Sequence, residues 1–270
     1  MSNPLVQINW RGRPVQMEHA WVGDARAPGP LLVFLHEGLG SVAMWRDFPG
    51  QLCAALGLRG LVYSRPGYGR SSPRPADEHW DNSFLHQQAH EVLPALLQAL
   101  GVTGPCALLG HSDGGSIALL HAAAYPAQVA ATIVMAPHIL VEEFGLVSIR
   151  QAREQYLHGG LRERLARYHD DVDSAFWGWN DVWLSPRFPE WQIGAELCTI
   201  THPVLAIQGE DDPYGTMAQI DGIAQVCPQT VLCKLPACGH SPHRDQTAQV
   251  ITAIQAFFQD IPRALQETTT

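Results

Sequence analysis

The feature that most constrains this chain is an apolar run that ends in a Gly-x-Ser-x-Gly motif and continues into a helix-like run. Residues 106–121 read CALLGHSDGGSIALLH, and Ser112 is the serine of the motif. A serine on a sharp strand-to-helix turn needs a strained backbone, and Gly110 and Gly114 let that turn close because they lack a Cβ. The helix points its positive N-terminal end at the serine hydroxyl. This context predicts an exposed, reactive serine rather than an ordinary glycine-rich turn.

An acidic pair and a histidine follow the serine in chain order, each just beyond a candidate strand. The apolar residues 204–207 precede Asp211 and Asp212, and residues 231–235 precede His240. Open parallel sheets place their sites in the loops at strand ends. Serine, then acid, then histidine is one of the known chain orders of a catalytic triad. Either aspartate can supply the acid on this evidence.

Strand signals and helix signals alternate along most of the chain. The expected strands are residues 5–10, 15–21, 31–35, 61–63, 106–111, 129–135, 204–207 and 231–235, of which the first two form a hairpin. The expected helices include residues 43–56 and residues 84–100, the second with a kink or break at Pro94 because proline lacks a backbone N–H. The alternation predicts the α/β class, with a doubly wound, mostly parallel sheet covered on both faces.

Composition and charge restrict the possible partners. The chain has 270 residues, 46% of them hydrophobic, which suits one catalytic domain with a large core. A net charge of −9 argues against nucleic acid or an anionic membrane surface as a partner. No run approaches the roughly 18 apolar residues of a membrane helix. Residues 1–4 lack the basic and apolar pattern of a signal peptide.

The cysteines and histidines predict neither disulfides nor a metal site. Six cysteines show no Cys-x-x-Cys pairing and mostly stand in apolar runs, as in a reduced cytoplasmic protein. His240 and His243 have a spacing that resembles metal ligands, but no acidic or cysteine cluster accompanies them. We therefore expect a cytoplasmic protein that needs no metal.

Four motifs resemble those of the α/β-hydrolase superfamily, in its branch of small lid-bearing esterases and carbon–carbon bond hydrolases. Residues 31–41, LLVFLHEGLGS, are similar to the family's strand and His-Gly oxyanion loop. Residues 63–71, YSRPGYGRS, are similar to its Asp-x-Arg-Gly-x-Gly-x-Ser loop. The Gly-x-x-Asp of residues 209–212 and the Gly-His of residues 239–240 complete the set. Two residues depart from the pattern: Glu37 replaces a glycine and Ser64 replaces an aspartate.

Residues 139–195 differ from the rest, and the resemblance implies that they form a helical lid. Residues 144–156 and 161–169 are amphipathic, and six aromatic residues follow: Phe176, Trp177, Trp179, Trp183, Phe188 and Trp191. We expect most of them to pack the lid onto the core and one or two to line a pocket. The core domain then comprises residues 1–138 and 196–270, on either side of the lid.

The resemblance also implies roles for the conserved motif positions. The family's spacing favours Asp212 over Asp211 as the acid that orients His240, which takes the proton of the serine during attack. The backbone N–H groups of Gly38 and Asp113 form the expected oxyanion hole. No cofactor is expected.

The expected partner is a small-molecule substrate, and the oligomeric state, including a homodimer, stays open. The side chains that we expect to contact the substrate are Glu37, His138, Arg150, Arg153, Trp177 and Trp183. Glu37 can instead face solvent or pair with Arg65, and Asp113 can simply favour the helix N-terminus. If either carboxylate faces the pocket, neutral esters should outperform anionic ones. A preference for anionic esters would instead indicate Arg150 or Arg153.

The expected reaction is hydrolysis of a carboxylic ester with a small or medium acyl group through an acyl-enzyme. The alternatives within the fold are carbon–carbon bond hydrolysis of a ring-cleavage product, thioesterase activity and lactonase activity. Dehalogenases and epoxide hydrolases are disfavoured because their nucleophile is a carboxylate. A non-catalytic binding module is also disfavoured, because no member of the triad is missing.

Overall fold

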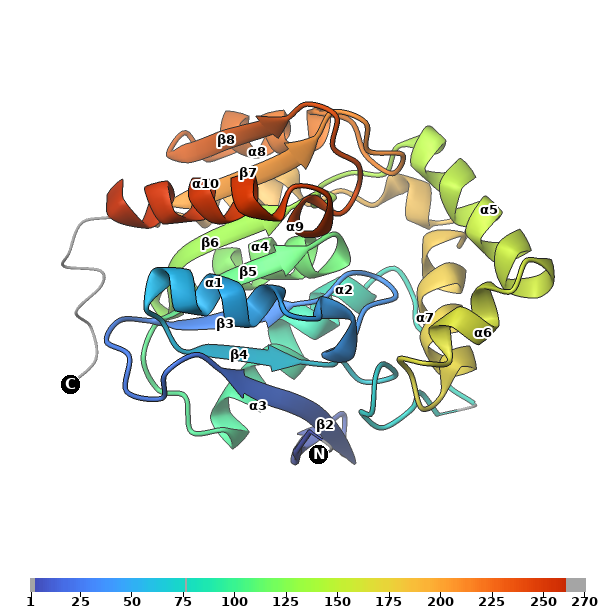
Figure 1. Ribbon diagram of the computed structural model, residues 1–270. Helices are drawn as coiled ribbons and strands as arrows, with labels where there is room; N and C mark the ends of the chain where they lie inside the picture. Colours follow the sequence, from blue (N-terminus) through green and yellow to red (C-terminus); the bar gives the residue numbers. More distant parts are fainter. Residues whose placement is uncertain (1–2, 76, 261–270) are drawn as a thin grey trace.

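A single sheet organises the part of the chain that the computed structural model describes, residues 3–75 and 77–260. Within these residues, eight strands lie in the order β1-β2-β4-β3-β5-β6-β7-β8 (Figure 1). They are β1 Leu5–Trp10, β2 Arg13–Val22, β3 Leu31–Leu35, β4 Gly60–Tyr63, β5 Cys106–His111, β6 Val129–Met135, β7 Val204–Gly209 and β8 Thr230–Leu235. β2 pairs antiparallel with β1 and β4, and every pairing from β4 to β8 is parallel. The predicted hairpin and the doubly wound, mostly parallel sheet are confirmed.

Helices cover both faces of this sheet. On the face toward the viewer in Figure 1 are α1 Phe48–Leu56, α9 Pro242–Asp245 and α10 Thr247–Asp260. The opposite face carries α2 Phe84–Gln87, α3 Leu93–Ala99, α4 Asp113–Ala124 and α8 Ala218–Val226, and a short 3-10 turn, η3 Pro126–Gln128, precedes β6.

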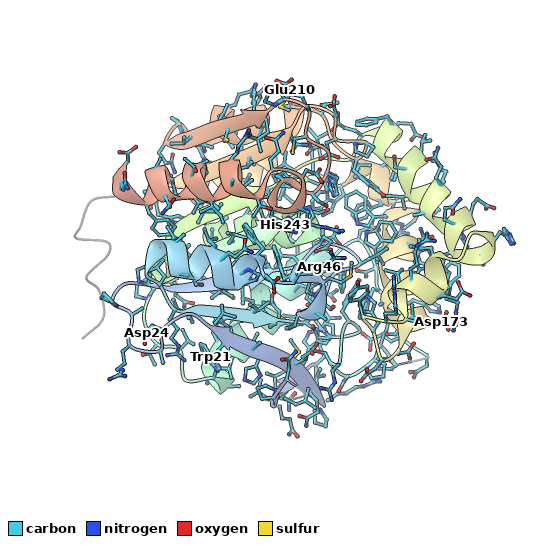
Figure 2. All side chains as sticks on the ribbon, in the orientation of Figure 1. Trp21, Asp24, Arg46, Asp173, Glu210 and His243 are labelled. Carbon is cyan, nitrogen blue, oxygen red and sulfur yellow. The ribbon has the colours of Figure 1, made fainter. Side chains whose placement is uncertain are left out.

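The strand residues alternate between the two hydrophobic cores that result. On β3, Leu32 and Phe34 pack with the α1 and α10 side, whereas Val33 and Leu35 pack with the α3 and α4 side. His243 of α9 lies on the first side, with its ring centroid 4.9 Å from that of Trp45 (Figure 2). The central strands β5, β6 and β7 are buried along their whole length, as parallel strands covered on two faces must be.

Two of the expected helices are interrupted. The helix expected over residues 43–56 is a 3-10 turn, η1 Ala43–Trp45, followed by α1, because Arg46 takes a φ of 52° that no right-handed helix tolerates. The helix expected over residues 84–100 consists of α2, a π-helical turn η2 Gln88–Val92 and α3. The π-helical turn ends at Val92, two residues before Pro94. Its wider spacing relieves the clash between the proline ring and the carbonyls of the preceding turn, and this is the form that the predicted kink takes.

A helical insertion separates β6 from β7. It contains α5 Glu143–His158, α6 Leu161–Leu165, α7 Val172–Trp183, and the 3-10 turns η4 Phe188–Glu190 and η5 Gly194–Thr199. Figure 1 shows α5, α6 and α7 beyond the carboxyl ends of the parallel strands. Aromatic contacts join these elements: the ring centroids of Tyr156 in α5 and Phe176 in α7 lie 3.7 Å apart, and those of Trp183 in α7 and Phe188 in η4 lie 4.7 Å apart. Among the described residues, no helix is both long and apolar enough to cross a membrane.

Candidate active site

Ser112 lies on the sharp turn between β5 and α4. Its backbone has φ 54° and ψ −121°, a region that is strained for any residue with a Cβ. A Cβ on Gly110 would overlap the backbone carbonyl of Gly114, and a Cβ on Gly114 would overlap that of Leu35. The two glycines therefore allow the turn to close against β3, and α4 begins at the next residue, Asp113.

Ser112, His240 and Asp212 form a continuous line of hydrogen bonds. The Nε2 atom of His240 lies 2.9 Å from the Oγ of Ser112. Its Nδ1 atom lies 2.8 Å from one carboxylate oxygen of Asp212 and 2.9 Å from the other. Because the carboxylate needs a donor, Nδ1 carries the proton, and Nε2 is left to accept one from the serine.

The surroundings of Asp212 keep it ionised and in place. Burial by itself raises the pKa of this carboxyl, but the hydrogen bond from His240 and the backbone N–H of Tyr214 offset it, so the pKa lies below its ordinary value. Gln208 also donates to the carboxylate at 2.7 Å. By contrast, Asp211 is exposed, and its backbone N–H donates to the carbonyl of Cys238. Only Asp212 is thus positioned to orient the histidine.

A cavity of about 190 Å³ lies over Ser112. From the core domain it is lined by Gly38, Asp113 and His138, among others, and from the insertion by Ile149, Trp179 and Trp183. The two expected oxyanion residues therefore lie beside the serine. Burial lowers the pKa of His138 to about 3, so this side chain is neutral near pH 7. Apolar and aromatic walls with a few polar groups are typical of a small-molecule site.

Backbone contacts hold the loop that carries Gly38. The Nδ1 of His36 donates to the carbonyl of Glu37 at 2.7 Å, and the backbone N–H of Arg65 donates to His36 Nε2 at 3.0 Å. Burial also lowers the pKa of His36 well below its usual value, so it stays neutral. The Nη2 atom of Arg65 donates to the same Glu37 carbonyl at 2.9 Å. The loop keeps an ordered shape although Glu37 replaces a glycine.

The pairing of Glu37 with Arg65, one of the alternatives left open by the sequence, does not occur; the carboxylate of Glu37 faces His111 instead. Its Oε2 atom lies 3.5 Å from Nδ1 of His111. Burial alone would raise the pKa of Glu37, but the neighbouring imidazoles of His111 and His243 hold it far below its usual range. The Nε2 of His111 in turn donates to the backbone carbonyl of His240 at 2.6 Å. Glu37 is thereby linked to the loop that carries His240.

Asp113 connects the turn at Ser112 to the insertion, which a simple helix-terminus role does not explain. Its buried carboxylate accepts a hydrogen bond from Trp183 Nε1 at 3.1 Å and lies 3.8 Å from Nη2 of the fully buried Arg65. Burial raises the pKa of Asp113 above its usual value, against the opposite influence of Arg65. Asp113, one of the two expected oxyanion residues, and Trp183 at the end of α7 are therefore joined directly.

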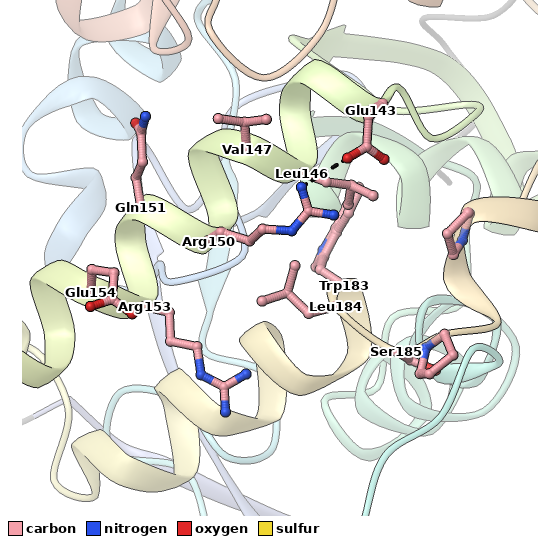
Figure 3. A pocket seen from close by; sticks show the side chains of 12 residues that line it. Glu143, Leu146, Val147, Arg150, Gln151, Arg153, Glu154, Trp183, Leu184 and Ser185 are labelled. Carbon is pink, nitrogen blue, oxygen red and sulfur yellow. Dashed lines mark hydrogen bonds and ion pairs between the residues drawn. The ribbon is translucent and has the colours of Figure 1, made fainter.

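Three of the side chains expected to contact substrate lie outside the cavity over Ser112. Arg150 and Arg153 line a separate groove of about 610 Å³ between α5 and α7, where Arg150 pairs with Glu143 at 2.8 Å (Figure 3). Trp177 lies under the side chain of Arg153, whose guanidinium carbon is 5.2 Å from the centroid of the Trp177 ring. Their helical spacing gave no indication of which side of the insertion each would face.

Sequence reasoning missed Trp179 and Tyr214 as lining residues of the catalytic cavity. Trp179 belongs to the aromatic cluster but was not distinguished from its neighbours, and the ring of Tyr214 lies 4.6 Å from that of His240. The sequence does offer a way to find Tyr214, because this residue stands only two positions after Asp212. In the described residues, no His, Cys, Asp and Glu side chains gather into a group that could hold a metal ion.

Glu18 supplies a carboxylate beside Ser64, where the family usually has aspartate. The hydroxyl of Ser64 donates to Glu18 Oε2 at 2.7 Å and accepts from the backbone N–H of Val42 at 2.9 Å. The same Oε2 accepts from the backbone N–H of Arg70 at 3.0 Å. A Cβ on Gly69 would overlap both side chains, so the glycine of this loop is required by the close approach.

Comparison with known proteins agrees with this geometry. The chain is 26% identical to polyketide synthase ThaQ of Burkholderia thailandensis, over 90% of this chain but only 13% of the length of that relative. It is 24% identical to sn-1-specific diacylglycerol lipase ABHD11 of Mus musculus, over 91% of this chain and 86% of the lipase. A thermophilic esterase from Thermogutta terrifontis shares the fold with a TM-score of 0.72 at 19% identity, over 96% of this chain and 99% of the esterase. The model of the alpha/beta hydrolase family matches residues 32–253. The chain belongs to the alpha/beta hydrolase family.

Proposed function

We propose that this hydrolase cleaves carboxylic esters of small or medium acyl groups through an acyl-enzyme on Ser112. The observation that carries the proposal is the position of His240, which lies within hydrogen-bond distance of both Ser112 Oγ and the carboxylate of Asp212. A serine hydroxyl is a weak nucleophile until an adjacent base accepts its proton, and this arrangement supplies the base and the group that orients it.

The proposed reaction has two halves. In the first, Ser112 Oγ attacks the ester carbonyl while His240 Nε2 takes its proton, and His240 returns that proton to the departing alcohol. The acid now remains bonded to Ser112 as an ester. In the second half, His240 removes a proton from water, the resulting nucleophile attacks the acyl-enzyme, and the free acid leaves as Ser112 regains its proton. Asp212 stabilises the imidazolium in both halves.

The oxyanion of each tetrahedral intermediate lies, in this proposal, between the backbone N–H groups of Gly38 and Asp113. Both residues border the cavity beside Ser112. The N–H of Asp113 is the first of α4, where N–H groups lack intrahelical partners and the helix dipole favours negative charge. The removal of one such donor typically costs about 3 kcal/mol of transition-state stabilisation.

The size and walls of the cavity support a small or medium acyl group. About 190 Å³ is below the usual range for drug-sized ligands, and the walls from the insertion are apolar. The insertion therefore acts as the lid in this proposal, since its side chains form part of the wall over Ser112. Carbon–carbon bonds, thioesters and lactones remain alternatives that a substrate panel separates.

The first experiment follows release of p-nitrophenol from p-nitrophenyl butyrate. We expect a burst equal to the enzyme concentration, and loss of at least about a thousandfold in kcat for Ser112→Ala with an unchanged melting temperature. A serine-directed fluorophosphonate should label the wild type once, on the peptide that contains Ser112. Label on another residue, or a fully active Ser112→Ala enzyme, would refute the proposal. Parallel assays with a thioester, a lactone and a ring-cleavage diketone rank the bond types.

The two adjacent aspartates provide a matched pair. Asp212→Asn should lower kcat by about 10³- to 10⁴-fold, because the amide favours the wrong imidazole tautomer. Asp211→Asn should stay close to wild type, because its exposed carboxylate does not reach His240. Equal losses in both variants would contradict the assigned triad.

A further inference from the structure

Trp183 is a shared wall between two cavities. It lines the catalytic cavity over Ser112 and also the groove between α5 and α7 in Figure 3. Among the described residues, no other side chain lines both. The groove has a volume of about 610 Å³, roughly three times that of the catalytic cavity. Removal of this one indole would therefore join a small cavity to a large one.

The indole of Trp183 is held firmly in this position. Its Nε1 donates to the carboxylate of Asp113, the residue next to the nucleophile, at 3.1 Å. Its ring centroid lies 4.9 Å from that of His138 on the core side and 4.7 Å from that of Phe188 on the insertion side. Only 4% of Trp183 is exposed. These contacts keep the wall closed.

The groove beyond Trp183 suits an aliphatic chain. Leu146 and Val147 from α5 and Leu184, directly after α7, supply apolar walls, between the polar side chains of Glu143, Gln151, Glu154 and Ser185. The two cations that line it are already engaged: Arg150 pairs with Glu143, and Arg153 lies over the ring of Trp177. An apolar chain that entered would bury its methylene groups without displacing Arg150 from Glu143 or Arg153 from the ring of Trp177.

We propose that Trp183 sets the acyl-chain length that the enzyme accepts, because its indole separates the catalytic cavity from the partly apolar groove between α5 and α7. This inference rests on the proposed esterase function and names the substrate class of that site. Acyl groups that fit within the closed cavity react well in the wild type. Longer aliphatic acyl groups are excluded by the indole rather than by the catalytic residues.

The test measures kcat/KM for p-nitrophenyl butyrate and p-nitrophenyl octanoate in the same enzyme preparation. Trp183→Ala should raise the octanoate-to-butyrate ratio by about tenfold or more, the gain expected when about two of the four additional methylene groups of octanoate become buried. A ratio within one variant cancels any general loss that follows from the broken bond to Asp113. Trp183→Phe provides the matched control, because it keeps an aromatic wall but has no N–H. It should lower both rates and leave the ratio near the wild-type value.

Trp177→Ala controls for loosening of the insertion, since Trp177 lies on the same helix α7 and packs against Phe176 but lies outside the catalytic cavity. Its ratio should stay at the wild-type value. An unchanged ratio in Trp183→Ala, or an equal rise in Trp177→Ala, would overturn the inference. Failure of the proposed function looks different, because the wild type would then hydrolyse neither ester in a Ser112-dependent way.

Discussion

The glycines around Ser112 differ in what presses against them. Gly110 and Gly114 face backbone carbonyls of the core domain, and a Cβ on either one would overlap those carbonyls. Gly38 faces the indole of Trp179, which belongs to the insertion. Backbone in a buried sheet cannot shift without disrupting its hydrogen bonds, whereas a side chain can change rotamer. The core half of the site is therefore rigid by construction, and the insertion half is adjustable.

The core domain and the insertion also differ in the chemical groups that they contribute to the site. The core domain contributes the proposed nucleophile, base and acid and both expected oxyanion donors. The insertion contributes apolar and aromatic walls to the catalytic cavity, with the N–H of Trp183 as a polar contact to Asp113. This division lets the reacting groups stay fixed while substrate choice varies with the insertion.

The largest effect is expected from a methyl group added on the core side of the site, where backbone surrounds the glycine. Gly114→Ala should prevent correct folding, because its Cβ would collide with the backbone carbonyl of Leu35, the last residue of the interior strand β3. We expect little soluble protein and no cooperative thermal transition. Gly50→Ala is the matched control: it lies in α1 with open space around it and should be neutral or stabilising by roughly 0.5–1 kcal/mol. A Gly114→Ala protein with the melting temperature of the wild type would show that the core half of the site is not rigid.

The same methyl group on the adjustable side should be tolerated by the fold. Gly38→Ala should leave the protein folded but lower kcat/KM by about 10- to 100-fold, because Trp179 and the oxyanion loop must move apart. Trp179→Leu in the same background removes the obstructing ring and should restore part of the activity. If the double variant is no better than Gly38→Ala alone, the loss does not come from contact with the insertion.

The last expected effect is a gradual loss of stability in acid, to which each buried histidine contributes only a part. Burial lowers the pKa of His138 and His243 to about 3 and that of His121 and His202 to about 4, against 6.5 unfolded. Above pH 6.5 these side chains are neutral in both states. Between pH 6.5 and about 4, the unfolded chain binds more protons, so the free energy of unfolding falls as the pH falls. Each histidine contributes up to about 1.4 kcal/mol per pH unit.

Urea unfolding at pH 7, 6 and 5 measures this slope. His121→Asn should flatten it, because it removes one buried imidazole and keeps a donor for the Ala89 carbonyl that His121 Nδ1 contacts at 2.8 Å. His158→Gln, at an exposed position of α5, should leave the slope unchanged. A midpoint that is the same at pH 7 and pH 5 would show that the buried histidines do not titrate as described.

Local patterns predicted the core half of the site well. The turn at Ser112, its two glycines and the strands before Asp212 and His240 each belong to a short run of sequence, and parallel strands bring their carboxyl ends to one edge. The interrupted helix at Arg46 escaped prediction because apolar periodicity does not report a single residue with positive φ. The π-helical form of the kink before Pro94 was likewise not evident, although its place was.

Contacts between distant segments could not be predicted in this way. Trp183 bonds to Asp113 across 70 positions of the chain, and His111 bonds to the His240 carbonyl across 129. The amphipathic pattern of the insertion shows that a helix has a buried side, but not which cavity that side will face. The pattern therefore did not indicate that the arginines of α5, expected to contact substrate, line a groove separate from the cavity over Ser112.

The amino-acid sequence by itself determined the α/β sheet, the strained serine turn and the order of the candidate triad, because these depend on neighbours within a few residues and on the period of apolar side chains. The tertiary structure alone decided that Glu18 would stand beside Ser64, that Glu37 would face His111, and that Trp183 would line the cavity over Ser112. Side chains meet across a fold only after the elements pack, and their burial and charge then depend on all the elements that surround them.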